Sequence, residues 1–186
     1  MPKIAIIIGS TRPGRVGEAV ARWVLGIAGQ RDDAEFELVD IADFKLPHLD
    51  EEVPPSAGHY SRPHTLAWAE KIGSFDGFVF VTPEYNHSTS GALKNAIDFL
   101  FAEWNDKAAG FVSYGSVGGA RAVEHLRLVM AELKVATVRA QVALSLATDF
   151  RNYSEFTPAG YHVAAVDTML DQVVSWSNAL APVRAA

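Results

Sequence analysis

Five short apolar runs alternate along the chain with longer segments in which apolar residues recur every three or four positions. The runs predict β-strands and the recurrences predict amphipathic helices, an alternation typical of parallel strands joined by crossover helices. We expect strands at residues 4–8, 36–40, 77–82, 109–114 and 137–144. The runs 4–8 and 78–81 are apolar throughout, which indicates central strands covered by helices on both faces.

The segments between these runs have helical periodicity. In the first of them Val16, Val20, Trp23, Val24 and Ile27 recur at spacings of three and four, which predicts a helix with one apolar face. Further helices are expected near residues 64–74, 91–101, 123–133 and 161–180. The pattern therefore predicts an α/β fold in which a single domain, residues 1–186, contains five β-α units.

Two segments show neither helical periodicity nor a strand-like apolar run. Residues 46–63 contain four prolines, and residues 148–160 separate the last predicted strand from the last predicted helix. We interpret both segments as long loops. Long loops inside compact α/β domains are often binding elements, so both are candidates for a role in a site.

Composition narrows the function classes. Hydrophobic residues make up 49% of the 186 residues and charged residues 20%, as in an ordinary globular domain. The formal net charge of −6 argues against a nucleic-acid partner, since such proteins bind through basic surfaces. The absence of cysteine excludes disulfides, thiolate metal sites and a cysteine nucleophile, so any redox activity requires a cofactor.

Hydrolytic and metal-dependent chemistries find little support in the chain. The six histidines have no helical ligand spacing, so we expect no metal site. No serine lies in a G-x-S-x-G motif, which argues against a serine hydrolase. The chain passes from Met1-Pro2-Lys3 directly into the first strand, and it has no apolar run long enough for a bilayer. We therefore expect a cytoplasmic protein with no membrane partner.

The loop after the first strand has the composition of an anion site. It reads Gly9-Ser10-Thr11-Arg12-Pro13-Gly14-Arg15-Val16-Gly17 and leads into the first predicted helix. Free N–H groups at a helix start, glycines that permit close approach and arginine side chains together favour a phosphate group. A nucleotide P-loop is disfavoured because Arg15 and Val16 replace its lysine and its metal-binding hydroxyl, and the G-x-G-x-x-G fingerprint also fails. The simple alternative is a solvated turn with surface arginines.

Two further loops of unusual composition follow the third and fourth strands. They read Thr82-Pro83-Glu84-Tyr85-Asn86-His87-Ser88-Thr89-Ser90-Gly91 and Ser113-Tyr114-Gly115-Ser116-Val117-Gly118-Gly119-Ala120. With strand order 2-1-3-4-5 the strands before all three loops are neighbours, so the loops converge at the sheet edge where such folds bind ligands. Each loop alone also fits an ordinary strand-to-helix turn, with glycines or with hydroxyls that cap the next helix.

Together the three loops resemble those of the NADPH-dependent FMN reductase family, which has a flavodoxin-like fold. The resemblance covers residues 3–133 and rests on Gly9-Ser10-Thr11-Arg12, on Pro83-Glu84-Tyr85-Asn86, and on Ser113-Tyr114-Gly115 with Gly118-Gly119. It implies an α/β three-layer sandwich, with a five-stranded parallel sheet in the order 2-1-3-4-5 and helices on both faces. It also implies FMN as cofactor and NADPH or NADH as electron donor.

By this resemblance the cofactor-binding residues fall into three groups. Ser10, Arg12, Arg15, Val16 and Gly17 are expected to hold the FMN phosphate. Pro83, Glu84, Tyr85 and Asn86 are expected to line the ribityl chain and the ring, while Ser113, Tyr114, Gly115, Gly118 and Gly119 border the isoalloxazine. Many relatives carry Ser or Asn at the position of Gly17, so a backbone N–H or Arg15 is expected to replace that contact.

The implied function is hydride transfer from NAD(P)H to FMN, followed by reduction of quinone, azo, flavin or metal-oxyanion acceptors in a ping-pong scheme. Because FMN carries the redox chemistry, no catalytic side chain is expected. Two alternatives stay open. One is a flavodoxin-type electron carrier, against which Arg12, Arg15 and the modest charge of −6 argue. The other is a non-redox sensor or ligand-binding protein with the same pocket.

The resemblance also implies a homodimer or a dimer of dimers. We expect the third and fourth helices to supply the contact, with apolar and aromatic residues such as Phe99 and Trp104. Surface aromatic residues are weak evidence for an interface by themselves, and Trp104 could instead belong to the core.

Overall fold

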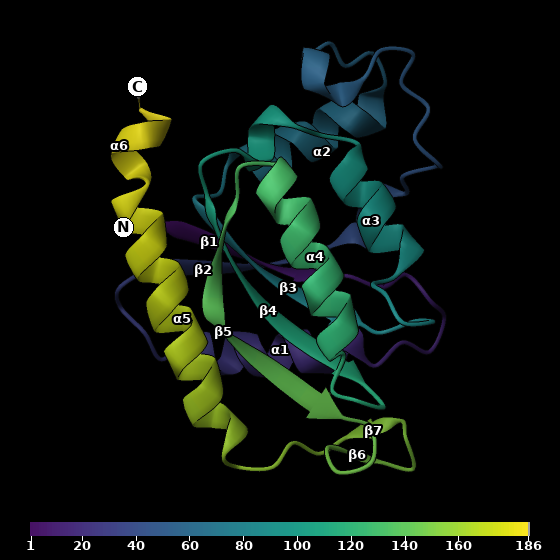
Figure 1. Ribbon diagram of the computed structural model, residues 1–186, viewed down its shortest axis with the longest axis vertical. Helices are drawn as coiled ribbons and strands as arrows, with labels where there is room; N and C mark the ends of the chain where they lie inside the picture. Colours follow the sequence, from purple (N-terminus) through teal and green to yellow (C-terminus); the bar gives the residue numbers. More distant parts are fainter. Residues whose placement is uncertain (186) are drawn as a thin grey trace.

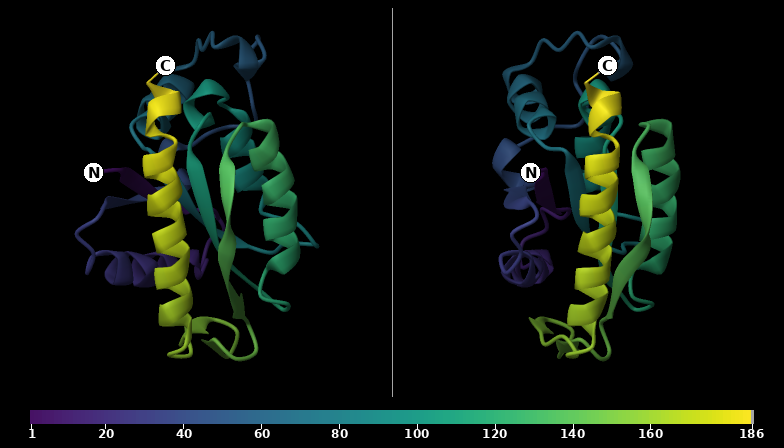
Figure 2. Two further views of the ribbon diagram at one scale, coloured as in Figure 1. Left: turned by 60° about the vertical axis from the view of Figure 1, so that its left-hand side comes forward. Right: turned by 90° about the vertical axis from the view of Figure 1, so that its left-hand side faces the viewer.

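A parallel β-sheet between two layers of helices forms the protein (Figures 1 and 2), as a computed structural model that describes residues 1–185 shows. The sheet has five strands in the order β2-β1-β3-β4-β5. The strands are β1 (Lys3–Ile8), β2 (Glu35–Asp40), β3 (Gly77–Pro83), β4 (Ala108–Gly115) and β5 (Ala136–Ser145). The predicted fold class and strand order are confirmed, and each predicted strand matches its observed bounds to within one residue at either end.

The helices divide between the two faces of the sheet. One face is covered by α1 (Gly17–Ala28) and α5 (His162–Ala179), and the other by α2 (Pro63–Gly73), α3 (Gly91–Asp98) and α4 (Ala120–Glu132). The chain also forms a short C-terminal helix, α6 (Ala181–Arg184), and three 3₁₀ turns, η1 (Ile41–Phe44), η2 (Pro55–Ala57) and η3 (Ala102–Trp104). None of the helices described within residues 1–185 is long and apolar enough to cross a membrane.

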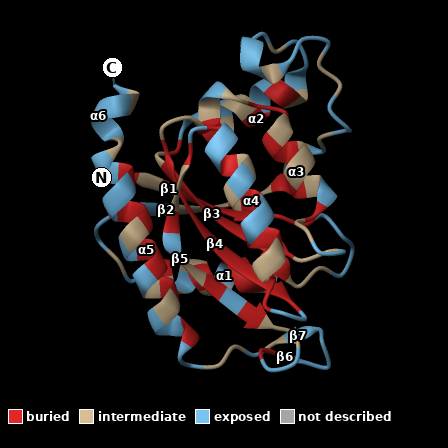
Figure 3. Ribbon diagram, viewed as in Figure 1, coloured by how far each residue is buried: buried red, intermediate tan, exposed pale blue. Residues whose placement is uncertain are grey.

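The core lies on both faces of the sheet, where buried positions follow the strands (Figure 3). Successive strand residues point to opposite faces, so an uninterrupted apolar run supplies both layers. In β1, for example, Ile4 and Ile6 pack under α1 and α5, while Ala5 and Ile7 face α2 and α3.

Two aromatic residues expected at an oligomer contact belong to this core instead. Phe99 and Trp104 are both 0% exposed. Trp104 packs edge-on against Trp68 and Phe78, and its indole Nε1 donates to the Ile97 carbonyl at 3.1 Å. The chain leaves α3 at Asp98, earlier than predicted, and turns both aromatic side chains inward. The expectation that they supply a subunit contact is therefore wrong.

The segment 148–160, expected to be a loop, contains a small hairpin of β6 (Phe150–Arg151) and β7 (Glu155–Phe156), below the arrowhead of β5 in Figure 1. Asp149 anchors it. Its buried carboxylate accepts hydrogen bonds from the Ser145 and Ala159 N–H groups at 2.9 and 3.1 Å and lies 3.0 Å from Nε2 of His162. The hairpin is therefore fixed next to the end of β5.

Candidate functional site at the carboxyl edge of the sheet

The loops after β1, β3 and β4 leave the sheet side by side. The Gly9 N–H donates to the Val81 carbonyl of β3 at 2.8 Å, and the Glu84 N–H donates to the Tyr114 carbonyl of β4 at 2.9 Å. These bonds extend the parallel ladder beyond the strands and fix the start of each loop. The convergence predicted from the strand order is thus present in the structure.

Side chains also join the first loop to the second. Ser10 is buried, and its Oγ lies 3.1 Å from the hydroxyl of Tyr85. The Arg12 Nε donates to the same hydroxyl at 3.2 Å, although most of this guanidinium is exposed. Tyr85, which was expected beside the ring and ribityl chain, therefore has its hydroxyl at the predicted phosphate loop.

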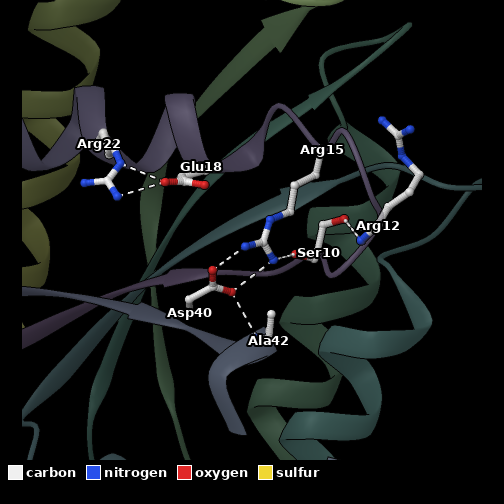
Figure 4. A network of polar contacts seen from close by, with 7 residues as sticks. All are labelled: Ser10, Arg12, Arg15, Glu18, Arg22, Asp40 and Ala42. Carbon is white, nitrogen blue, oxygen red and sulfur yellow. Dashed lines mark hydrogen bonds and ion pairs between the residues drawn. The ribbon is translucent and has the colours of Figure 1, made fainter. Parts of the chain in front are cut away.

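The side chain of Arg15 extends from the first loop to Asp40 (Figure 4). Its guanidinium forms a two-point ion pair with Asp40 at the end of β2, with Nη1 3.0 Å from Oδ1, and it donates to the Ser10 carbonyl. Asp40 also accepts from the Ala42 N–H at 3.0 Å. The charge of Arg15 is therefore compensated within the protein, whereas Arg12 points away from this network. A direct contact between Arg15 and a phosphate stays a prediction.

The second loop makes a tight two-residue turn after Pro83. Tyr85 and Ser88 exchange two backbone hydrogen bonds, at 2.9 and 3.1 Å, and the residues between them, Asn86 and His87, have φ values of 47° and 75°. This is the left-handed pair that a primed hairpin turn requires, and asparagine tolerates it well. The turn places Asn86 at the tip of the loop.

A serine ends the second loop and starts α3. Ser90 Oγ accepts from the Leu93 N–H at 3.0 Å and donates to the Gly9 carbonyl. Among the loop hydroxyls Ser88, Thr89 and Ser90, Ser90 is therefore the one that caps the helix, and it also ties α3 to the start of the first loop.

Glu84 contributes its backbone to the site, since its side chain points to α4. The carboxylate is 4% exposed and forms an ion pair with Arg121, with Nε 2.6 Å from Oε1, and it accepts from the Arg121 N–H at 3.1 Å. Burial by itself raises the pKa of Glu84, but the hydrogen bonds and charge of Arg121 outweigh burial and lower it. The carboxylate therefore stays ionised and holds the loop against α4.

The third loop is built around glycines with little free space. Gly118 and Gly119 have φ values of 68° and 72°, and Ser113 Oγ donates to the Gly118 carbonyl at 2.7 Å. A Cβ on Gly119 would lie 2.7 Å from the Cβ of Ser113 and 2.9 Å from the Tyr114 N atom. Only glycine fits at this position, so the turn into α4 is specified by its sequence.

A cavity of about 110 Å³ opens between the three loops. Its walls come from all of them and from the β6–β7 segment: Arg12, Val16, Pro83, Glu84, Tyr85, Tyr114, Gly115, Leu146 and Tyr153. Leu146 and Tyr153 were not among the predicted site residues. The signal that could have found Tyr153 is an aromatic residue in the middle of a polar loop that follows the strand next to β4.

The polar groups at this cavity include a buried hydroxyl. The Tyr114 hydroxyl beside the cavity is buried and has no hydrogen-bond partner among the described residues. In the described part of the chain no cluster of three or more metal-ligating side chains occurs. A doubly wound parallel sheet with the strand order 2-1-3-4-5 defines a flavodoxin-like α/β protein, and in this fold ligands bind at the carboxyl edge of the sheet.

Comparison with known proteins identifies the family. Residues 2–149 match the NADPH-dependent FMN reductase family, and the chain belongs to it. It is 41% identical over 159 residues to an NAD(P)H-dependent FMN reductase of Nectria sp, covering 80% of this chain and 79% of that protein. It is 38% identical over 135 residues to a quinone reductase of Escherichia coli strain K12, covering 69% of each chain.

A solved structure shares the fold. It is the flavoenzyme NAD(P)H:(acceptor) oxidoreductase FerB of Paracoccus denitrificans, with a TM-score of 0.74 and 22% sequence identity. The match covers 96% of this chain and 98% of that one. The flavodoxin-like arrangement of strands and helices is therefore shared over nearly the whole of both chains.

Proposed function

We propose that this protein is an NAD(P)H-dependent FMN reductase that passes electrons to small acceptors, quinones first among them. The observation that carries the proposal is the convergence of Ser10, Arg12, Tyr85 and an unpartnered Tyr114 hydroxyl at the N-terminal end of α1. Hydroxyls, a guanidinium and free main-chain N–H groups suit a phosphate monoester such as that of FMN.

Each part of the site has its own task in holding FMN. Ser10, Arg12, Val16 and Gly17 hold the phosphate, and Arg15 holds the loop in place through Asp40. The second loop, Pro83–Asn86, and the third loop, Ser113–Gly119, border the ribityl chain and the ring with backbone groups. When bound, FMN supplies the redox chemistry, accepting a hydride from NAD(P)H and releasing electrons to an acceptor.

The protein residues bind and orient, and none is assigned a proton-transfer or nucleophilic role. Glu84, the buried carboxylate of the second loop, is committed to Arg121 and keeps its pKa low, so it is a poor proton donor. A cavity lies beside Arg12, Tyr85 and Tyr153. Under this proposal the donor and the acceptor use this same cavity and bind in turn, in a ping-pong scheme. Azo compounds, free flavins and metal oxyanions are further acceptors under this proposal.

The visible absorption spectrum of the purified protein mixed with FMN, before and after anaerobic NADPH, tests the proposal. Flavin bands that bleach on addition of NADPH, with steady NADPH oxidation once a quinone is present, support a reductase. An electron carrier would bind FMN but oxidise almost no NADPH without a partner enzyme. A protein that quenches no flavin fluorescence at all would be a non-redox binding protein.

We also propose a homodimer, or a dimer of dimers, with the contact near α4. Leu128 on α4 is 74% exposed, and Val117 in the adjoining loop is 53% exposed. Apolar side chains beside the third loop would be covered by a second copy of the chain. Light scattering at micromolar concentration tests this, since a mass near 20.1 kDa would contradict it.

A further inference from the structure

The hydroxyl of Tyr114 is an anomaly in a well-packed part of the protein. Tyr114 is 5% exposed, and its ring lies 5.9 Å from that of Phe150. Its Oη has no hydrogen-bond partner within the described residues. A buried hydroxyl without a partner is unfavourable, because on folding it loses its hydrogen bonds to water and forms no hydrogen bond within the protein. A phenylalanine would satisfy the packing, so the hydroxyl requires another explanation.

Gly17 indicates where this hydroxyl points. A Cβ built on Gly17 would lie 2.7 Å from Tyr114 Oη, closer than a carbon and an oxygen atom can approach. The phenol of β4 therefore reaches across to the first turn of α1 and occupies the space that a side chain at position 17 would take. Any residue other than glycine at this position would displace the hydroxyl.

The same turn of α1 presents free donors. The first helical hydrogen bond runs from the Val20 N–H to the Val16 carbonyl at 3.2 Å, so the N–H groups of Gly17, Glu18 and Ala19 have no partner inside the helix. The helix has 12 residues, and its N-terminal end carries partial positive charge. An anion at this end would meet main-chain donors and the phenol together.

Neighbouring groups keep the phenol protonated. Burial first, and the nearby Tyr85 hydroxyl second, raise the pKa of Tyr114 well above its usual value, although Arg12 and Arg15 act in the opposite direction. A protonated phenol donates a hydrogen bond, and phosphate is the group in FMN that accepts such a bond most strongly.

We infer that the Tyr114 hydroxyl is a ligand of the FMN phosphate, and that it can lie against the first turn of α1, where this phosphate binds, because residue 17 is glycine. The inference rests on the proposed function and deepens it. It moves Tyr114 from the border of the ring to the phosphate, and it makes Gly17 and Tyr114 a matched pair. The pair contributes selectivity for the phosphorylated flavin over riboflavin.

The variant Tyr114→Phe tests this inference by fluorescence titration with FMN and with riboflavin. Loss of a hydrogen bond to a charged group should weaken FMN binding by about tenfold or more, while riboflavin binding stays as in the wild type. Equal weakening for both flavins, or for neither, overturns the inference but leaves the proposed function intact. A wild-type protein that binds neither flavin contradicts the proposed function and this inference with it.

Apoprotein stability gives a second readout that a packing role would not produce. Removing an unpartnered hydroxyl should raise the melting temperature of flavin-free Tyr114→Phe by about 2 to 4 °C. Ser177→Ala is the matched control, because Ser177 Oγ is also buried without a partner but lies on α5, away from the site. This control should gain stability and keep its FMN affinity. A Tyr114→Phe protein that melts lower than the wild type would contradict the inference.

The variant Gly17→Ser distinguishes a matched pair from two independent residues. In the wild-type background its Cβ meets Tyr114 Oη and should weaken FMN binding. With Tyr114→Phe that atom is gone, the nearest ring atoms are 3.6 and 3.7 Å away, and the serine hydroxyl enters the space beside the phosphate. The double variant should therefore bind FMN more tightly than either single variant. Additive losses in the double variant would overturn the pairing.

Discussion

The two edges of the β-sheet both carry a cavity and basic side chains, yet they differ in how their polar groups are used. At the amino edge a cavity of about 520 Å³ is lined by Asp76, Lys107 and Arg184, among others. At the carboxyl edge the cavity between the three loops measures about 110 Å³. By size alone, the amino edge would be the candidate site.

Charged groups at the amino edge are engaged with partners inside the protein. Asp76 accepts from the Lys3 N–H and from Arg184, both at 2.8 Å. Lys107 Nζ donates to the carbonyls of Ile72 and Gly73 at the end of α2, at 3.1 and 3.3 Å. The bond from Arg184 holds the C-terminal helix against the sheet, and the bonds from Lys107 join the start of β4 to α2. The polar groups of this edge therefore stabilise the fold.

At the carboxyl edge several hydrogen-bond donors have no partner among the described residues. The first N–H groups of α1 are free of helical bonds, and within the described residues the buried Tyr114 hydroxyl has no partner. Arg12 is exposed, and its guanidinium donates only within the loops, to the Tyr85 hydroxyl and to the Pro13 and Gly14 carbonyls. Residues with positive φ occur at both edges, at Asn86, His87 and Gly119 here and at Asp106 and Lys134 at the amino edge. Under the proposed function, free helix N–H groups beside an exposed arginine, rather than volume, distinguish the edge that would bind FMN.

The largest contrast should come from adding one methyl group at each edge. Gly119→Ala at the carboxyl edge combines a φ of 72° with a Cβ 2.9 Å from a backbone nitrogen, and should lower the free energy of unfolding by about 3 to 5 kcal/mol. Gly73→Ala at the amino edge, with no neighbour closer than 4.0 Å, should raise it by about 0.5 to 1 kcal/mol. Urea denaturation of both variants measures the difference, and equal effects would contradict it.

The second contrast concerns Lys107 at the amino edge and how the free energy of unfolding depends on pH. Burial, and then the charge of Arg184, lower the pKa of Lys107 to about 8, from an ordinary value of 10.5. Between these values the unfolded chain binds more protons, so the free energy of unfolding should rise with pH, by at most about 3 kcal/mol. Lys107→Met should remove this rise, as denaturation at pH 7.5 and 10.5 would show. Identical pH profiles for the two proteins would contradict this account of Lys107.

The smallest expected difference comes from removing one arginine at each edge, and it concerns FMN affinity alone. Arg12→Ala should weaken FMN binding by about 1.5 to 3 kcal/mol, the value of a hydrogen bond to a charged group. Arg184→Ala should leave FMN binding unchanged, because its guanidinium is bonded to Asp76 and to the Asp106 and Ser177 carbonyls. Flavin fluorescence quenching measures both. Loss of affinity in Arg184→Ala but not in Arg12→Ala would move the site to the amino edge.

Much of this fold was predictable because its strands are apolar throughout. A run such as Ile4 to Ile8 specifies a strand covered on both faces, and the order of the strands then brings three polar loops together. Helix ends were less predictable. The end of α3 depends on Phe99 and Trp104 turning into a core that no local pattern reveals.

The sequence predicted which loops form the candidate site, but it did not predict which contacts each side chain makes. Arg15 and Glu84 are both engaged by partners distant in sequence, Asp40 and Arg121, that only the folded sheet brings near. The position of the Tyr114 hydroxyl against Gly17 depends on two strands and a helix at once. Sequence patterns indicate what kind of loop follows a strand, whereas these side-chain pairs form only through tertiary packing.

A crystal structure of the protein with FMN bound tests the central claim most directly, because it shows which edge of the sheet holds the phosphate. The account predicts the phosphate against the first turn of α1, within hydrogen-bond distance of Ser10, Arg12 and the Tyr114 hydroxyl. A phosphate seated beside Lys107 and Arg184, or anywhere other than the loop after β1, would contradict it.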